Sequence, residues 1–117
     1  MTRLHHLNLG VTPERADAEA DFLTDILGYR KVEPSEQEKS LGARFYETDD
    51  GTQVHLSVDP DFQPALRAHT GLEIGTELQT VATRLRAASI EFKDVEIDGR
   101  RILFCRDPAG NGWELRS

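Results

Sequence analysis

The chain has 117 residues, of which 38% are hydrophobic and 30% are charged, and its formal net charge is −7. This length and composition predict one soluble globular domain with a sizeable core, and they exclude a disordered chain or a membrane protein. The acidic balance excludes a surface of clustered Lys and Arg, so we expect neither nucleic acid nor a membrane as a partner. The lone Cys105 and a start without an apolar leader predict a cytoplasmic location.

The first half of the chain predicts the element order βαβββ. Residues 4–11 alternate between apolar and polar side chains, which is typical of a half-buried strand. A helix is expected next, with Thr12 as its cap, Pro13 in its first turn and Gly28 at its end. Three further strands are expected, and a polar loop at 34–42 separates the first two: 29–33, 43–48 and 52–58.

The second half, after a proline-containing linker at 59–68, repeats this order. A strand at 69–74 precedes a helix for which Thr76 and Gln79 form a predicted capping box. Three strands follow, with Asp98-Gly99 as a hairpin turn between the first two: 90–97, 101–106 and 112–116. The sequence therefore predicts two βαβββ modules, at 4–58 and 69–117, in a single domain.

The correspondence between the two halves extends to single residues. His6 precedes His69 by 63 positions, and the segment DDGTQVHLS precedes PAGNGWELR by 59, which places His55 opposite Glu114. The apolar residues of these strands share the phase expected to pack under the helices. In the opposite phase lie four side chains suited to binding a cation: His6, His55, His69 and Glu114. His5 has the core-facing phase and is expected to be structural.

Four segments resemble the vicinal oxygen chelate superfamily, which includes glyoxalase I, bleomycin-resistance proteins, extradiol dioxygenases and fosfomycin-resistance enzymes. They are HHLNLGV, GTQVHLSV, HTGLEIG and the closing RDPAGNGWEL. The resemblance covers nearly the whole chain and implies an α+β fold in which paired βαβββ modules form a cup-shaped mixed sheet with helices outside. It also implies that His6, His55, His69 and Glu114 bind one divalent metal, either Zn, Ni, Mn or Fe(II). A homodimer is a further implication.

The resemblance implies a metal-dependent lyase or isomerase that polarises a chelating small substrate and stabilises an enolate-like intermediate. Glu114 is the candidate general base, with Glu73 as a second candidate. His55 stands where glyoxalase I commonly has Glu, so glutathione chemistry does not follow. Two alternatives stay open. One is an Fe(II) dioxygenase that uses only His6, His69 and Glu114, and the other is a non-catalytic protein that sequesters a drug or other small molecule.

The substrate-facing wall is predicted from strand phase. If Phe45 and Phe104 face the core, the cup-facing residues of their strands include Arg44, Tyr46, Leu103 and Cys105. We expect Cys105 to be a packing residue rather than a nucleophile. The candidate substrate contacts are Asn8, Arg44, Tyr46, Ser57, Glu73, Leu103 and Cys105.

Overall fold

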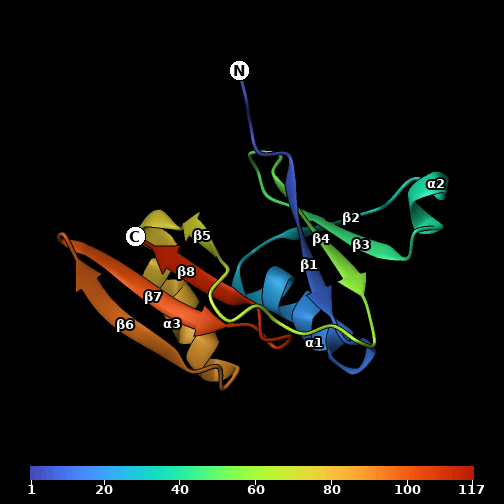
Figure 1. Cartoon of the computed structure of the whole chain (residues 1–117). Helices are drawn as coiled ribbons and strands as arrows, with labels where there is room; N and C mark the ends of the chain where they lie inside the picture. The colour runs from blue at the N-terminus through green and yellow to red at the C-terminus, as the bar shows by residue number, and fades with distance from the viewer. The chain divides into compact units, whose positions relative to one another are not determined.

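The computed structural model describes all of residues 1–117 and contains two compact units, which we call the first module (Met1–Gln63) and the second module (Pro64–Ser117). The boundary between them lies inside the segment predicted as a linker. Each module consists of a four-stranded sheet with helical segments (Figure 1). No helix in either module is long and apolar enough to cross a membrane.

The sheet of the first module has the strand order β1-β4-β3-β2, in which β1 and β4 are parallel and the other pairs antiparallel. Its elements are β1 (His6–Val11), a 3₁₀ turn (Pro13–Arg15), α1 (Ala16–Asp21), a π-helical turn (Phe22–Ile26), β2 (Arg30–Val32), α2 (Glu36–Lys39), β3 (Ala43–Glu47) and β4 (Gln53–Val58). The predicted strands are therefore confirmed.

Two local details of the first module differ from the sequence prediction. Thr12 makes no capping hydrogen bond with its side chain, although Pro13 does begin the helical segment and Gly28, at φ +83°, follows its end. The expected loop at 34–42 contains the short helix α2. Ser35 Oγ accepts from the Glu38 N–H at 3.1 Å while Glu38 Oε1 accepts from the Ser35 N–H at 2.9 Å, so a capping box starts α2.

The second module has the equivalent strand order, β5-β8-β7-β6, again with one parallel pair. Its elements are β5 (His69–Glu73), a 3₁₀ turn (Gly75–Glu77), α3 (Leu78–Ala87), β6 (Phe92–Ile97), β7 (Arg100–Arg106) and β8 (Gly112–Arg116). Asp98 and Gly99 both have positive φ, at 52° and 75°, which suits the predicted hairpin turn. The Thr76–Gln79 capping box is wrong, because Glu77 is the N-cap and no side chain caps this end.

The two modules repeat each other in strand register. Phe45 pairs with His55 in the first module, and Phe104 pairs with Glu114 in the second. In the parallel ladders, Asn8 pairs with His55 and Gly71 pairs with Glu114. The predicted α+β class with two βαβββ modules is therefore confirmed.

One face of each sheet is covered by helix. In the first module, Arg44 Nη1 on β3 donates to Asp17 Oδ1 on α1 at 3.1 Å. In the second, Arg101 Nη1 on β7 donates to Gln79 Oε1 on α3 at 2.7 Å. The buried strand residues that face the helices are Val11, Tyr46, Val54, Leu56, Leu103, Cys105, Trp113 and Leu115. The candidate ligands lie in the opposite phase, on the faces of the two sheets that the helices leave uncovered.

Candidate metal centre and substrate face

The second module brings His69 and Glu114 together from the neighbouring strands β5 and β8. His69 Nε2 lies 3.6 Å from Glu114 Oε1. His69 Nδ1 lies 3.0 Å from the Arg67 carbonyl oxygen, which can only accept, so Nδ1 carries a proton and the lone pair of the neutral ring lies on Nε2. Two atoms bound to one cation at about 2.1 Å stand about 3.0–3.4 Å apart. The pair is therefore close to the spacing of two ligands of one ion.

Arg116 fixes the other carboxylate oxygen of Glu114. Its Nη1 donates to Glu114 Oε2 at 2.7 Å, and the Glu114 side chain is only 19% exposed. Oε2 is thus held by a charge-assisted hydrogen bond, while Oε1 is the oxygen nearest His69. A residue that hydrogen-bonds to a metal ligand without binding the metal itself orients that ligand toward the metal. Sequence reasoning missed Arg116, although its position two residues after Glu114 on the same strand puts it in the ligand phase.

Asp107, in the loop before β8, holds the start of that strand. Its Oδ1 accepts from the Ala109 N–H at 3.1 Å and the Asn111 N–H at 2.8 Å. Its Oδ2 accepts from Trp113 Nε1 at 2.9 Å. The DPAGN segment therefore has a physical role: its aspartate ties the loop to the strand that carries Glu114.

The first module stacks two candidate ligands, His6 on β1 and His55 on β4. Their ring centroids lie 4.0 Å apart at an interplanar angle of 17°, and the His55 ring also lies 4.1 Å from that of Phe45. His5 does not face the core as expected. It precedes β1, is exposed, and its Nδ1 lies 2.9 Å from Nδ1 of His6.

The environment of His55 favours the neutral imidazole. Burial lowers the pKa of His55, the nearby His6 and His5 lower it further, and Glu38 opposes them. His55 Nε2 lies 2.8 Å from Gln53 Oε1. Because a neutral imidazole is the form that binds metals, His55 is prepared for ligation near neutral pH.

Each module thus supplies two of the four predicted ligands on one face. Neither module by itself gathers three His, Cys, Asp or Glu side chains into a group that could hold a metal ion. The binding of all four to one cation stays a prediction. The donor set, of imidazole nitrogens and one carboxylate, fits the divalent ions Zn, Ni, Mn and Fe(II).

Four substrate candidates were predicted to lie on the ligand-bearing faces of the sheets, and this prediction is wrong. Phe45 pairs with His55 and Phe104 with Glu114, and paired residues project to the same side of a sheet. The two phenylalanines therefore share the ligand face. The helix-covered face instead carries Arg44, Tyr46, Leu103 and Cys105.

The remaining substrate candidates lie in the ligand phase, as expected. Asn8 pairs with His55 in the sheet, and Ser57 Oγ donates to Asn8 Oδ1 at 2.9 Å. Glu73 shares the phase of His69 at the end of β5. Its Oε1 lies 3.7 Å from Arg100 Nη1, in an exposed ion pair. Asn8 and Ser57 are therefore better placed than Glu73 to contact a molecule near the histidines.

A cleft of about 1110 Å³ opens in the second module beside His69. Apolar side chains supply much of its lining, including Phe92, Val95, Ile97 and Phe104. Arg67 and Lys93 add positive charge at this lining. A cleft of this composition suits a small organic ligand with an apolar part.

Two four-stranded sheets, each carrying a pair of candidate ligands on its uncovered face, define a duplicated βαβββ protein of the glyoxalase type. The family described as the Glyoxalase/Bleomycin resistance protein/Dioxygenase superfamily matches residues 3–115, and the chain belongs to this family. No curated protein sequence matches it.

Solved structures share the fold at low sequence identity. A glyoxalase family protein from Bacillus anthracis is 20% identical with a TM-score of 0.84, covering 99% of this chain and 94% of its own. A glyoxalase/dioxygenase from Nostoc punctiforme is 23% identical with a TM-score of 0.82, covering 97% and 89%. A variant of the fosfomycin resistance protein FosX from Listeria monocytogenes, complexed with Mn(II) and 1S,2S-dihydroxypropylphosphonic acid, is 19% identical with a TM-score of 0.80, covering 100% and 92%.

Proposed function

We propose that this protein is a divalent-metal-dependent lyase or isomerase acting on a small, oxygen-rich substrate. His6, His55, His69 and Glu114 are the proposed ligands of the metal. The Mn(II) bound by the Listeria FosX variant supports a divalent ion in this family, and Mn is accordingly the first ion to test beside Zn, Ni and Fe(II). The proposed assembly is a homodimer in the cytoplasm.

The observation that carries the proposal is the arrangement of His69 and Glu114. His69 Nε2 and the Glu114 carboxylate oxygen Oε1 lie 3.6 Å apart. The other polar atom of each side chain already has a partner. His69 Nδ1 contacts the Arg67 carbonyl oxygen, and Glu114 Oε2 accepts from Arg116. Metal ligands commonly have partners that fix the histidine tautomer and the orientation of the carboxylate. A surface ion pair needs neither.

A bound divalent cation would supply a Lewis acid that polarises two substrate oxygens. The protein's own contribution begins with Glu114, whose Oε1 would be the proton acceptor for an isomerase or lyase step after leaving the metal. Arg116 holds Oε2, so Oε1 stays the oxygen available first to the metal and then to the proton. Asn8 and Ser57, on the His55 face of the first module, are the proposed substrate contacts.

One observation favours a second candidate, the Fe(II) dioxygenase with a triad of His6, His69 and Glu114. His55 Nε2 is hydrogen-bonded to Gln53 and its ring lies between His6 and Phe45. With Nε2 occupied by Gln53, His55 can bind a metal only through Nδ1. In the dioxygenase alternative, His55 is instead an acid–base group and the metal is held by the other three residues. In this alternative, His55→Ala would keep metal binding and lose turnover of a catechol.

Metal titration of purified protein tests the proposal. Wild type should bind about one divalent ion per set of four ligands, and His69→Ala and Glu114→Gln should each weaken binding strongly. Glu73→Gln is the matched control, because it removes an exposed carboxylate of β5 that is not a proposed ligand. Absence of binding to wild type for Mn, Zn, Ni and Fe(II) would refute the metalloenzyme proposal and favour a metal-free binder.

Activity screening then separates the reaction classes. Adducts of 2-oxoaldehydes with thiols, acyl-CoA epimers and catechols would be offered to the metal-loaded protein. Turnover of a catechol with consumption of dioxygen would replace the lyase or isomerase proposal by the dioxygenase. Tight binding of a small molecule without turnover would support sequestration.

A further inference from the structure

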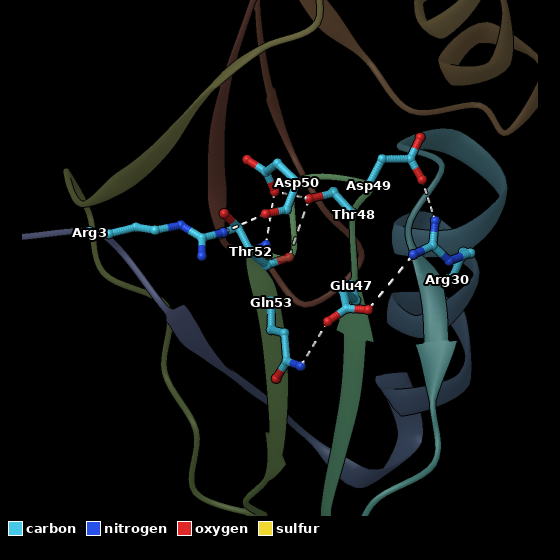
Figure 2. Close-up of polar contacts among 8 residues, drawn as sticks. All are labelled: Arg3, Arg30, Glu47, Thr48, Asp49, Asp50, Thr52 and Gln53. Atoms are coloured by element: carbon cyan, nitrogen blue, oxygen red, sulfur yellow. Dashed lines mark hydrogen bonds and ion pairs between the residues drawn. The ribbon is translucent and has the colours of Figure 1, made fainter.

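A chain of polar contacts leads from the edge of the first module to His55. Gln53 on β4 lies directly opposite Glu47 on β3, and its Nε2 donates to Glu47 Oε1 at 3.2 Å. The other end of the same amide, Oε1, lies 2.8 Å from His55 Nε2. Figure 2 shows the Gln53 amide directed across to Glu47 on the neighbouring strand. The Glu47 carboxylate in turn is directed toward Arg30 on β2. Gln53 therefore connects a carboxylate to a histidine.

The direction of this chain is determined by its carboxylate end. A carboxylate has no N–H, so Glu47 can only accept, and Gln53 must turn its NH₂ group toward it. The amide oxygen then faces His55. An amide oxygen also only accepts, so His55 Nε2 must carry the proton and the lone pair of the neutral ring lies on Nδ1.

Glu47 is itself held in place. Its Oε2 lies 3.7 Å from Arg30 Nη2, and Arg30 also forms a salt bridge with Asp49. Oε2 is thus directed toward Arg30, which leaves Oε1 for Gln53. The arrangement does not depend on Gln53 alone, because each group fixes the orientation of the next.

The second module lacks this chain of polar contacts, and its ligand at the equivalent position has no tautomer to be fixed. At the positions 59 residues later, equivalent to Glu47 and Gln53, stand Arg106 and Gly112, which pair in register in the same way. The ligand at the equivalent of His55 is there Glu114, a carboxylate with no tautomers. The chain of polar contacts is therefore present in the module where the ligand is a histidine and absent from the module where the equivalent ligand is a carboxylate.

We propose that Gln53, oriented by Glu47, is a positioning residue that fixes the proton of His55 on Nε2 and so presents Nδ1 to the metal. The part that concerns metal binding rests on the proposed function. The tautomer of His55 does not rest on it, because it is a property of the metal-free protein. Gln53 itself contacts neither metal nor substrate.

Nitrogen NMR of the histidine side chains in the full chain reads the tautomer directly. Metal-free wild type above the His55 pKa should show His55 protonated on Nε2. Gln53→Leu removes the acceptor, and Glu47→Gln removes the constraint on the amide, so both should raise the Nδ1–H fraction. Glu38→Gln is the matched control: it removes a carboxylate that acts on His55 by charge but does not contact Gln53. It should leave the tautomer unchanged.

Metal titration of the same variants gives the second measurement. Loss of a partner that orients a metal ligand weakens binding by about 10–100-fold, and Gln53→Leu should show this loss. An Nδ1–H tautomer of His55 in wild type, or an unchanged tautomer in a folded Gln53→Leu protein, would overturn the proposal. A wild type that binds no metal would refute the proposed function, while the NMR result would still decide the role of Gln53.

Discussion

The substitution Asp107→Asn tests whether the loop before β8 is held by a carboxylate that binds the indole of Trp113. Asp107 and Trp113 are both nearly fully buried, with 5% and 1% of their surface exposed. A side-chain amide in the native orientation keeps an oxygen for the N–H groups of Ala109 and Asn111. It places its NH₂ group, however, against Trp113 Nε1, which lies 2.9 Å from Asp107 Oδ2 in the native protein. Two donors then face each other.

The magnitude follows from the lost contact. A hydrogen bond to a charged group contributes about 1.5–3 kcal/mol, and a buried donor left without an acceptor costs about 1–3 kcal/mol. We therefore expect Asp107→Asn to lower the free energy of unfolding by about 2–3 kcal/mol. At about 4 °C per kcal/mol for a chain of this size, Tm should fall by about 8–12 °C.

A double-mutant cycle with Trp113→Phe isolates the contact. Chemical unfolding followed by circular dichroism would be measured for wild type, both single variants and the double variant. Because a phenyl ring has no N–H, Asp107→Asn should cost about 1–3 kcal/mol less in the Trp113→Phe background. Equal costs of Asp107→Asn in the two backgrounds would show that the indole contact contributes nothing and refute the reasoning.

Three further outcomes are expected. Arg116→Met should weaken metal binding by about 10–100-fold in calorimetric titration, because Glu114 Oε2 loses its partner, and unchanged affinity would argue against a role for Arg116. Burial, with a smaller effect of Asp107, raises the pKa of Cys105 to about 12, so iodoacetamide at pH 8 should alkylate the native thiol about a thousandfold more slowly than the unfolded one. Hydrogen bonds from Thr48 and Thr52 lower the pKa of Asp50 to about 2 (Figure 2). Its contribution to stability is therefore present above about pH 4 and lost as the pH falls toward 2, so Asp50→Asn should flatten the stability profile in that window and no other.

Strand alternation predicted the ligand faces well, because β1, β4, β5 and β8, the first and last strands of each module, separate apolar from polar side chains. It failed for β3 and β7. In β3, Phe45 and Tyr46 are adjacent and both buried, and in β7 the same holds for Ile102 and Leu103. A strand with buried residues on both faces carries no alternation from which the phase can be determined.

The groups that support the ligands could not be predicted in the same way. Gln53 and Arg116 have the correct phase, but phase does not say which atom of a flexible side chain meets which partner. The direction of the Gln53 amide depends on Glu47, six positions earlier and on another strand. The residue identities were visible in the sequence, whereas the hydrogen bonds between them require the register of the sheet.

The divergence of the two modules at Gly112 has a steric reason that fits the chemistry of the ligands. A Cβ at Gly112 would lie 3.1 Å from the His69 Cβ and 3.3 Å from the Ala68 carbonyl oxygen, so a side chain there would displace the start of β5. In the first module the equivalent residue, Gln53, has the room to orient His55. The second module therefore cannot carry an amide at this position without moving His69. A carboxylate such as Glu114, fixed from the other side by Arg116, is a ligand that needs no amide there.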